Sequence, residues 1–176
     1  MAEKLAIDRS KTAVIIMDYQ MRQLSFFTEA FQQEILARAK EVLTKARGAG
    51  IPVINIEVVR GERTPETKIH PSVAPPPGEM LLTKTTAGPF ASTNLEQVLK
   101  QKGFSTLALL GLTTSGCVLS TVRYASDLGY RLVVLSDCCA DRDEEVQRVL
   151  MEKIFPRQFP QPVAVVPAQE FIQALG

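Results

Sequence analysis

Three side chains with complementary chemistry each follow an apolar run of this sequence. The Asp18 carboxylate comes after TAVIIM, the Lys84 ammonium after MLLT, and the Cys117 thiol after LALLGL and a short turn. Brought together, they would form a nucleophilic site. The thiolate would attack a carbonyl carbon, the carboxylate would accept the thiol proton, and the ammonium would favour the thiolate. Backbone N–H groups of the turn could hold the resulting oxyanion.

Cys117 lies in GLTTSGCVLSTVRYASDLG, where a predicted strand passes into a predicted helix. In the first turn of a helix, unpaired N–H groups and the helix dipole stabilise a thiolate. The alternative is an inert thiol, because cysteine is among the most frequently buried residue types. Position alone favours that alternative, so any catalytic role depends on the partners of Cys117.

Ordinary structural roles are open for the other candidates as well. Asp18 could cap a helix or lie in a solvated loop, and Lys84 could be a surface lysine. Asp137, which follows the run RLVVLS, is most simply a turn or cap residue. Cys138 and Cys139 are most simply packed thiols at the end of a strand.

Composition limits the class of protein. A chain of 176 residues with 45% hydrophobic residues suits one globular domain over residues 1–176. The formal charge of +1 gives no basic field for nucleic acid or anionic membrane. No apolar run is long enough to span a bilayer, and MAEKLAIDRSK has no apolar signal-peptide core. We therefore expect a cytoplasmic protein with a small-molecule substrate and no nucleic-acid or membrane partner.

Histidine and cysteine usage argues against a metal site. His70 is the single histidine, and its Pro-rich surroundings favour an exposed loop position over a catalytic one. This count excludes a zinc site built on several histidines and any Cys–His–Asp triad without His70. Three cysteines are too few for a disulfide framework. We expect no metal and no cofactor.

Strand-like and helix-like segments alternate along the chain, which predicts an α/β fold with a mainly parallel sheet of about six strands and helices on both faces. Residues 60–79, with five prolines, form a long irregular stretch that could be functional or a plain spacer. Thr93-Asn94-Leu95-Glu96 is a capping box for one of the helices. The predicted strands are 12–17, 51–59, 80–83, 105–110, 131–136 and 163–166, and the predicted helices 29–47, 93–103, 115–128, 142–154 and 168–175.

The chain resembles the isochorismatase-like cysteine hydrolases, a family that includes nicotinamidases and N-carbamoylsarcosine amidohydrolases. Asp18-Tyr19-Gln20 is similar to the family's aspartate–x–glutamine, and Lys84 opens a segment with the family's phenylalanine–x–x–threonine–x–leucine run. The segment GLTTSGCV fits glycine–x–x–threonine–x–x–cysteine–valine around Cys117. The resemblance covers nearly the whole chain, and the three motifs in this order are highly specific.

This resemblance implies a three-layer, Rossmann-like domain with a catalytic triad of Asp18, Lys84 and Cys117. It also implies a cis peptide between Leu112 and Thr113, which would aim the backbone N–H groups of Thr113 and Cys117 at an oxyanion. The implied chemistry is thiolate attack, loss of ammonia or an amine, and hydrolysis of the thioester acyl-enzyme by water. The implied substrate is a small amide, carbamoyl or ureido compound.

Departures from the family pattern refine these expectations. The segment IEVVRGERT after the second strand lacks histidine, which disfavours zinc and nicotinamide. Met21-Arg22-Gln23 replaces the usual asparagine–aspartate–phenylalanine. The resulting pocket candidates are Gln20, Phe26, Phe90 and Ser115, and Arg22, Arg60 or Arg63 could bind a substrate carboxylate or be ordinary exposed arginines.

Two other functions remain open at this stage. True isochorismatases hydrolyse a vinyl ether and typically lack the cysteine, so Cys117 favours amide chemistry over an isochorismate-type reaction. A non-catalytic ligand-binding or redox-sensing module would keep the fold and the thiol without turnover. The resemblance also implies a homo-oligomer, a dimer or a tetramer.

Overall fold

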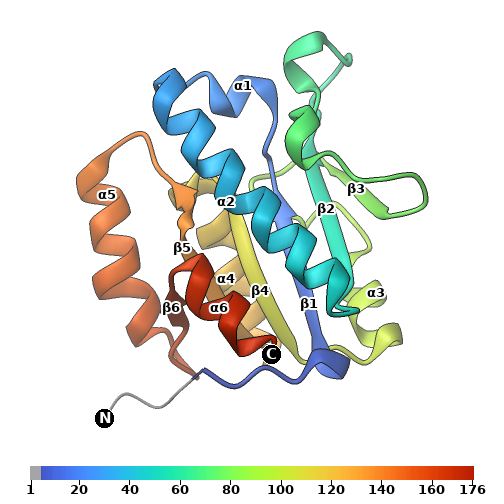
Figure 1. Cartoon of the computed structure of the whole chain (residues 1–176), viewed down its shortest axis with the longest axis vertical. Helices are drawn as coiled ribbons and strands as arrows, with labels where there is room; N and C mark the ends of the chain where they lie inside the picture. Colours follow the sequence, from blue (N-terminus) through green and yellow to red (C-terminus); the bar gives the residue numbers. More distant parts are fainter. Residues whose placement is uncertain (1–4) are drawn as a thin grey trace.

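A single sheet of six parallel strands runs through the molecule, as seen in the computed structural model, which describes residues 5–176 (Figure 1). The strand order is β3-β2-β1-β4-β5-β6, so the direction of strand addition reverses between β1 and β4. This is the doubly wound order in which ligands bind at the carboxyl ends of the central strands. The strands are β1 (Thr12–Met17), β2 (Val53–Val58), β3 (Met80–Lys84), β4 (Thr106–Leu112), β5 (Arg131–Ala140) and β6 (Ala164–Val166).

Helices cover both faces of the sheet. In the view of Figure 1, α2 and α6 lie in front of the strands, whereas α3 and α4 lie behind them. The predicted α/β architecture is therefore confirmed. The helices are α1 (Met21–Leu24), α2 (Glu29–Gly48), α3 (Leu95–Lys102), α4 (Leu119–Asp127), α5 (Glu144–Val149) and α6 (Ala168–Ala174). No helix of residues 5–176 is both long and apolar enough to cross a membrane.

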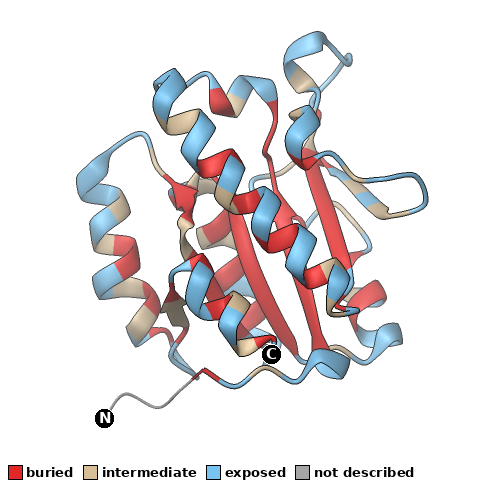
Figure 2. Ribbon diagram, in the orientation of Figure 1, coloured by how far each residue is buried: buried red, intermediate tan, exposed pale blue. Residues whose placement is uncertain are grey.

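The central strands form the core. Every residue of β1 and of β4 is buried, and Figure 2 shows both strands as continuously buried ribbons between the helices. A parallel strand covered on both faces requires an unbroken apolar run, which explains why the sequence here shows no polar alternation. Burial of this kind fixes the strands rigidly and with them the residues at their ends.

Strand register brings the carboxyl ends of β1, β2, β3 and β4 to one edge of the sheet. Met17 pairs with Gly111 of β4, and Val58 of β2 pairs with Lys84 of β3. The Asp18 N–H donates to the Ile56 carbonyl of β2 at 2.9 Å, directly after β1 ends. Residues that follow these strands are therefore neighbours in space although they are distant in sequence.

The capping box predicted at Thr93 does not form. Helix α3 begins at Leu95 with Asn94 as its N-cap residue, and the Glu96 carboxylate pairs with Lys100 one turn further along the helix at 2.5 Å. The Thr93 hydroxyl instead accepts a hydrogen bond from the Leu95 N–H and donates to the Pro89 carbonyl. The predicted helix is present, but it begins at Leu95 and not at Thr93.

Other boundaries differ where the backbone departs from regular geometry. The predicted helix 115–128 is an α-helix only from Leu119, because Thr114–Val118 forms a π-helical turn. A second π turn, Leu150–Ile154, continues α5 within the predicted helix 142–154. Strand β5 extends to Ala140, four residues beyond its predicted end, with an irregular register against β4.

Candidate active site

Asp18 and Lys84 form a buried ion pair at the carboxyl edge of the sheet. The Lys84 Nζ lies 2.7 Å from Asp18 Oδ2, and 1% and 6% of their side chains are exposed. Asp18 has a positive φ of 58°, a left-handed backbone that Asp tolerates better than most residues because its short polar side chain can bond locally. The backbone turns there directly after β1. The alternatives of a solvated aspartate and a surface lysine are therefore wrong.

All three donors of the Lys84 ammonium have an acceptor. Besides Asp18, Lys84 Nζ donates to the carbonyls of Thr86 at 3.1 Å and of Ala87 at 2.8 Å. An ammonium group has three donors and no acceptor. Lys84 therefore holds one carboxylate oxygen in place and has no N–H left for a second ligand.

Cys117 lies in the π turn that follows β4. Its Sγ is 3.5 Å from the Thr113 carbonyl, which also accepts hydrogen bonds from the Gly116 and Val118 N–H groups. The Leu112–Thr113 peptide is cis, as the family resemblance implied. A Cβ at Gly111 would lie 3.0 Å from the Cys117 Sγ, so the thiol needs a glycine beneath it.

Burial sets the protonation of both candidate catalytic groups. Desolvation raises the pKa of Asp18 to about 6, although Lys84 opposes the shift. Burial and the neighbouring Asp18 carboxylate raise the pKa of Cys117 well above its ordinary value, and Lys84 offsets only part of this. Burial therefore favours the thiol form of the resting sulfur. This effect opposes the stabilisation of a thiolate that the helix start predicts.

The open acceptor beside the thiol is Asp18 Oδ1. This atom is buried and has no hydrogen-bond partner within residues 5–176, whereas Oδ2 is held by Lys84. Asp18 and Cys117 line the same cavity, and the Asp18 carboxylate is one of the causes that raise the pKa of Cys117. The carboxylate thus offers one fixed oxygen and one free oxygen.

These three residues line a cavity of about 360 Å³, a size that suits a small ligand. Gln20 and Phe26 also line it, as predicted. Both polar atoms of the Gln20 side-chain amide form hydrogen bonds with the backbone. Nε2 donates to the Val58 and Thr67 carbonyls, and Oε1 accepts from the Val58 N–H. Gln20 therefore holds β2 and the 60–79 stretch in place around the cavity.

Phe90 and Ser115 are also predicted pocket residues, but they do not line this cavity. Phe90 stacks on Tyr124 of α4, with ring centroids 4.9 Å apart and 7° between the planes. Ser115 is exposed, because the π turn directs its backbone N–H to the Asp141 carboxylate at 2.7 Å. The three arginines also separate: Arg22 and Arg60 line the cavity, whereas Arg63 pairs with Glu57.

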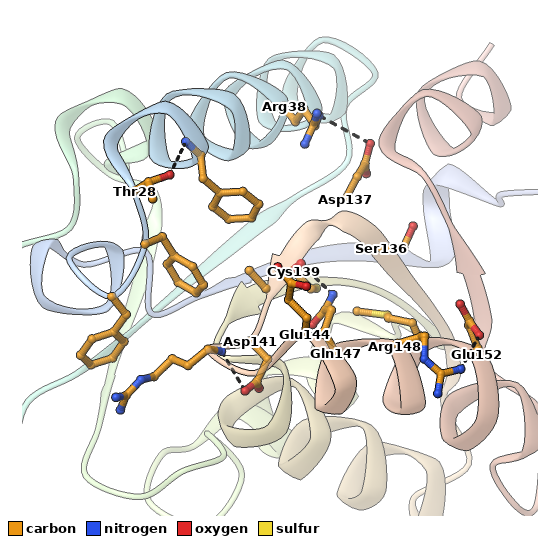
Figure 3. A pocket seen from close by; sticks show the side chains of 16 residues that line it. Thr28, Arg38, Ser136, Asp137, Cys139, Asp141, Glu144, Gln147, Arg148 and Glu152 are labelled. Carbon is orange, nitrogen blue, oxygen red and sulfur yellow. Dashed lines mark hydrogen bonds and ion pairs between the residues drawn. The ribbon is translucent and has the colours of Figure 1, made fainter.

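A second cavity, of about 680 Å³, lies between α2 and α5 (Figure 3). Its only thiol, Cys139, has its pKa raised to about 12 by burial, and no lysine lines it. This larger cavity therefore lacks the lysine that accompanies an aspartate and a cysteine in the Cys117 cavity. Figure 3 shows Asp141 on its wall, and the same carboxylate holds the Ser115 N–H, so the wall supports the Cys117 turn. Phe26 lines both cavities.

The remaining candidates have structural roles. The Asp137 carboxylate accepts a hydrogen bond from the N–H of Ala168, the first residue of α6, at 2.7 Å, which confirms the cap interpretation. Cys138 and Cys139 are buried free thiols, also as expected. His70 is half-buried rather than exposed, and its Nδ1 accepts a hydrogen bond from the Ser72 N–H. Residues 5–176 contain no group of three or more His, Cys, Asp or Glu side chains that could hold a metal ion.

Several supporting residues were missed in the sequence. The Thr86 and Ala87 carbonyls that hold Lys84 carry no side-chain signal, since any residue supplies a carbonyl. Asp141 follows a strand that was predicted to end earlier, so its proximity to Ser115 could not be inferred. These partners become visible only in the three-dimensional structure, where the segments that follow the strands meet.

Comparison with known proteins identifies close structural and sequence relatives. The isochorismatase domain profile matches residues 12–166. YecD of Escherichia coli O157:H7, an isochorismatase family protein, is 28% identical over 173 residues, which cover 87% of this chain and 92% of YecD. Ureidoacrylate amidohydrolase RutB of Rhizobium rhizogenes is 28% identical over 178 residues, covering 77% of this chain and 72% of RutB.

The fold has a counterpart among solved structures. A cysteine hydrolase from Pseudomonas syringae pv. phaseolicola superposes with a TM-score of 0.85, covering 99% of this chain and 98% of the other. Its sequence is 22% identical, so this similarity establishes the three-dimensional arrangement alone. The expected Rossmann-like architecture is confirmed by it.

Proposed function

Because the chain belongs to the isochorismatase family of hydrolases, we propose that it hydrolyses a C–N bond of a small amide, carbamoyl or ureido compound, with Cys117 as nucleophile. Asp18 acts as the general base and acid, and Lys84 positions Asp18. The amidohydrolase among its relatives supports this choice of bond. The oxyanion is held by the backbone N–H groups of Thr113 and Cys117.

One observation carries the proposal: Asp18 divides its two oxygens between two tasks. Oδ2 is fixed by Lys84 at 2.7 Å, and the buried Oδ1 has no partner among the described residues. Burying an acceptor without a donor costs free energy. Such an atom therefore suggests that a donor turns toward it during function. The Cys117 thiol in the same cavity is that donor.

The chemical steps follow from this protonation pattern. Cys117 Sγ attacks the carbonyl carbon while its proton passes to Asp18 Oδ1, and the carbonyl oxygen becomes an oxyanion. The oxyanion re-forms the carbonyl, the C–N bond breaks, and the nitrogen leaves with the proton from Asp18. Water then gives a proton to Asp18 while its oxygen adds to the thioester carbon. The C–S bond breaks, and Asp18 returns this proton to Cys117 Sγ, which restores the thiol and the carboxylate.

The low exposure and the raised pKa of Cys117 favour an enzyme over a redox-sensing module. Sensor cysteines are solvent-accessible and have low pKa values, because the thiolate is the form that oxidants attack. Cys117 is 3% exposed, and its pKa is shifted upward. A thiol of this kind needs an adjacent base at the moment of attack, as in an enzyme with proton transfer coupled to bond formation.

The test is a panel of small amides and ureido acids assayed for released ammonia. We expect turnover with the wild type and none with Cys117→Ala. Cys138→Ala is the matched control, since it removes an equally buried thiol outside the cavity and should retain activity. Acid quenching during turnover should leave an acyl adduct on Cys117, detected by mass spectrometry. Equal rates for wild type and Cys117→Ala would exclude the mechanism.

A further inference from the structure

The cavity around Cys117 has a cationic wall that the proposed chemistry does not use. Arg22 and Arg60 both line it, from α1 and from the segment after β2 respectively. We propose that these two guanidinium groups bind a carboxylate of the substrate, so that the substrate is an amide or ureido acid with a negative charge near the scissile bond. This proposal rests on the proposed function and specifies its substrate class.

Neither guanidinium has a carboxylate partner within residues 5–176. Arg60 donates through Nε to the Thr85 carbonyl at 2.7 Å, which fixes the group at the cavity wall and leaves its two terminal nitrogens available. By contrast, Arg47, Arg63 and Arg148 are each paired with a glutamate. Planar guanidinium groups recognise carboxylates bidentately, so two of them on one cavity match an anionic ligand.

The charges of the whole cavity also favour an anionic ligand. The charged side chains that line it are two carboxylates, Asp18 and Glu66, and three cations, Lys84, Arg22 and Arg60. Asp18 and Lys84 neutralise each other in their ion pair. Glu66 balances one arginine, and one net positive charge remains for the ligand. Arg60 is also near enough to Asp18 to lower its pKa, which places this positive charge close to the reacting groups.

The arginines of the cationic wall are available to a ligand, whereas Lys84 is not. Lys84 has all its donors occupied, so the carboxylate of a substrate cannot displace Asp18 from it without loss of a buried ion pair. Arg22 and Arg60 are exposed, and neither has a carboxylate partner among the described residues, so both can bind a ligand without breaking an ion pair. A short acid with an amide at its other end therefore places the carbonyl at Cys117 and the carboxylate at the arginines.

Three amides of equal length test this charge preference. Succinamate carries a carboxylate, butyramide a methyl group and β-alaninamide an ammonium at the same position. We expect the wild type to prefer succinamate over butyramide in kcat/KM, and β-alaninamide to be the poorest. Arg22→Gln and Arg60→Gln should each raise the KM for succinamate about tenfold with little change in kcat, because a charge-assisted hydrogen bond of this size binds ground state and transition state alike. The KM for butyramide should change far less, since butyramide carries no carboxylate.

Arg157→Gln is the matched control, since it removes the same charge from an exposed position outside the cavity and should leave all three substrates unaffected. Charge reversal in Arg22→Glu plus Arg60→Glu should turn the preference toward β-alaninamide. Equal kcat/KM for the three amides in the wild type, or an unchanged KM for succinamate in both Gln variants, would overturn the proposal while the amidase function stands.

Binding provides a readout that does not depend on turnover. Calorimetry of Cys117→Ala with succinamate and butyramide should show binding of the acid alone, and Arg22→Gln plus Arg60→Gln in that background should remove it. If no amide is hydrolysed but succinamate binds through the arginines, the proposed function fails and the anion site stands. If succinamate binds no better than butyramide, the anion site is overturned.

Discussion

The Lys84 ammonium lies 2.7 Å from the Asp18 carboxylate, where the side chains are only 1% and 6% exposed. Two buried opposite charges stabilise each other only in this close contact, because each has lost its hydration. The other carboxylate oxygen has no hydrogen-bond partner in the described part of the chain, and Asp18 lines the cavity that also holds Cys117. The pair is therefore a structural element and, in the proposed mechanism, also supplies the base, and these two roles can be separated experimentally.

The pH dependence of activity should show an acid limb near pH 6. Asp18 must be ionised to accept the thiol proton, and burial raises its pKa to about 6. We expect kcat/KM to fall about tenfold for each pH unit below that value, as measured with a substrate that does not titrate in this range. Asp18→Asn should remove the activity. A limb near pH 4, the range of an ordinary aspartate, would show that another group controls the reaction.

Stability should respond to the ion pair in a pH-dependent way. Lys84→Met leaves Asp18 buried without its cation, which we expect to cost about 3 kcal/mol at pH 7.5. The pKa of Asp18 is raised in the fold, and more so without Lys84, so the folded state favours the protonated acid. The stability that it contributes is present below the unfolded pKa of 3.8 and is lost as the pH rises through the folded value.

Urea unfolding of three proteins at pH 5 and pH 7.5 checks this. Lys84→Met should lose less stability at pH 5 than at pH 7.5, because Asp18 is then neutral. Adding Asp18→Asn to Lys84→Met removes both charges and should restore most of the loss at pH 7.5. A double variant no more stable than the single one would contradict the assignment of the loss to an uncompensated charge.

Asp141 should act as a positioning residue for the Cys117 turn. Its Oδ2 holds the Ser115 N–H at 2.7 Å, two residues before the nucleophile. We expect Asp141→Ala to lower kcat about tenfold with little change in KM, and Asp141→Asn to recover most of it because the amide oxygen can still accept. Asp143→Ala is the control: it removes the cap of α5, costs about 1 kcal/mol of stability and leaves kcat unchanged. Equal loss of kcat in both alanine variants would indicate a general structural effect.

Gly111→Ala should displace the Cys117 thiol, because Gly111 packs directly against it. A Cβ there would lie 3.0 Å from both Cys117 Sγ and Val118 Cγ2, in a strand without free space. Overpacking of this kind lowers the free energy of unfolding by about 1–3 kcal/mol. Displacement of the Cys117 sulfur should also lower kcat. Gly48→Ala, at the end of α2 with nothing near its Cβ, is the matched control and should be neutral or slightly stabilising. Chemical denaturation and steady-state kinetics on both variants measure the difference.

The sheet could be predicted because parallel strands buried on both faces require long apolar runs. The segments before Asp18 and Cys117 are runs of this kind, and the positions of both residues at strand ends follow from them. The start of α3 could not be predicted from Thr93, because the capping-box pattern does not say whether Glu96 turns back to the cap or forward to Lys100. Local patterns leave such choices open.

The site itself was predictable in its residue types but not in its electrostatics. Lysine is rarely buried, and only the Asp18, Thr86 and Ala87 acceptors make the burial of Lys84 tolerable. The helix start near Cys117 suggested a thiolate, whereas the depth of burial yields a thiol. Burial depends on how α4 and the sheet pack together, and no motif encodes it.

The strand order has a consequence for how this protein folds. β1 pairs with β4, so the segment bearing Asp18 meets the segment bearing Cys117 only after the intervening β2 and β3 have been synthesised. Non-local pairing of this kind is a slow part of folding, because the chain between the strands must be ordered first. Recovery of hydrolytic activity during refolding therefore reports the completion of the central β1–β4 pairing, a step that helix signals alone would not detect.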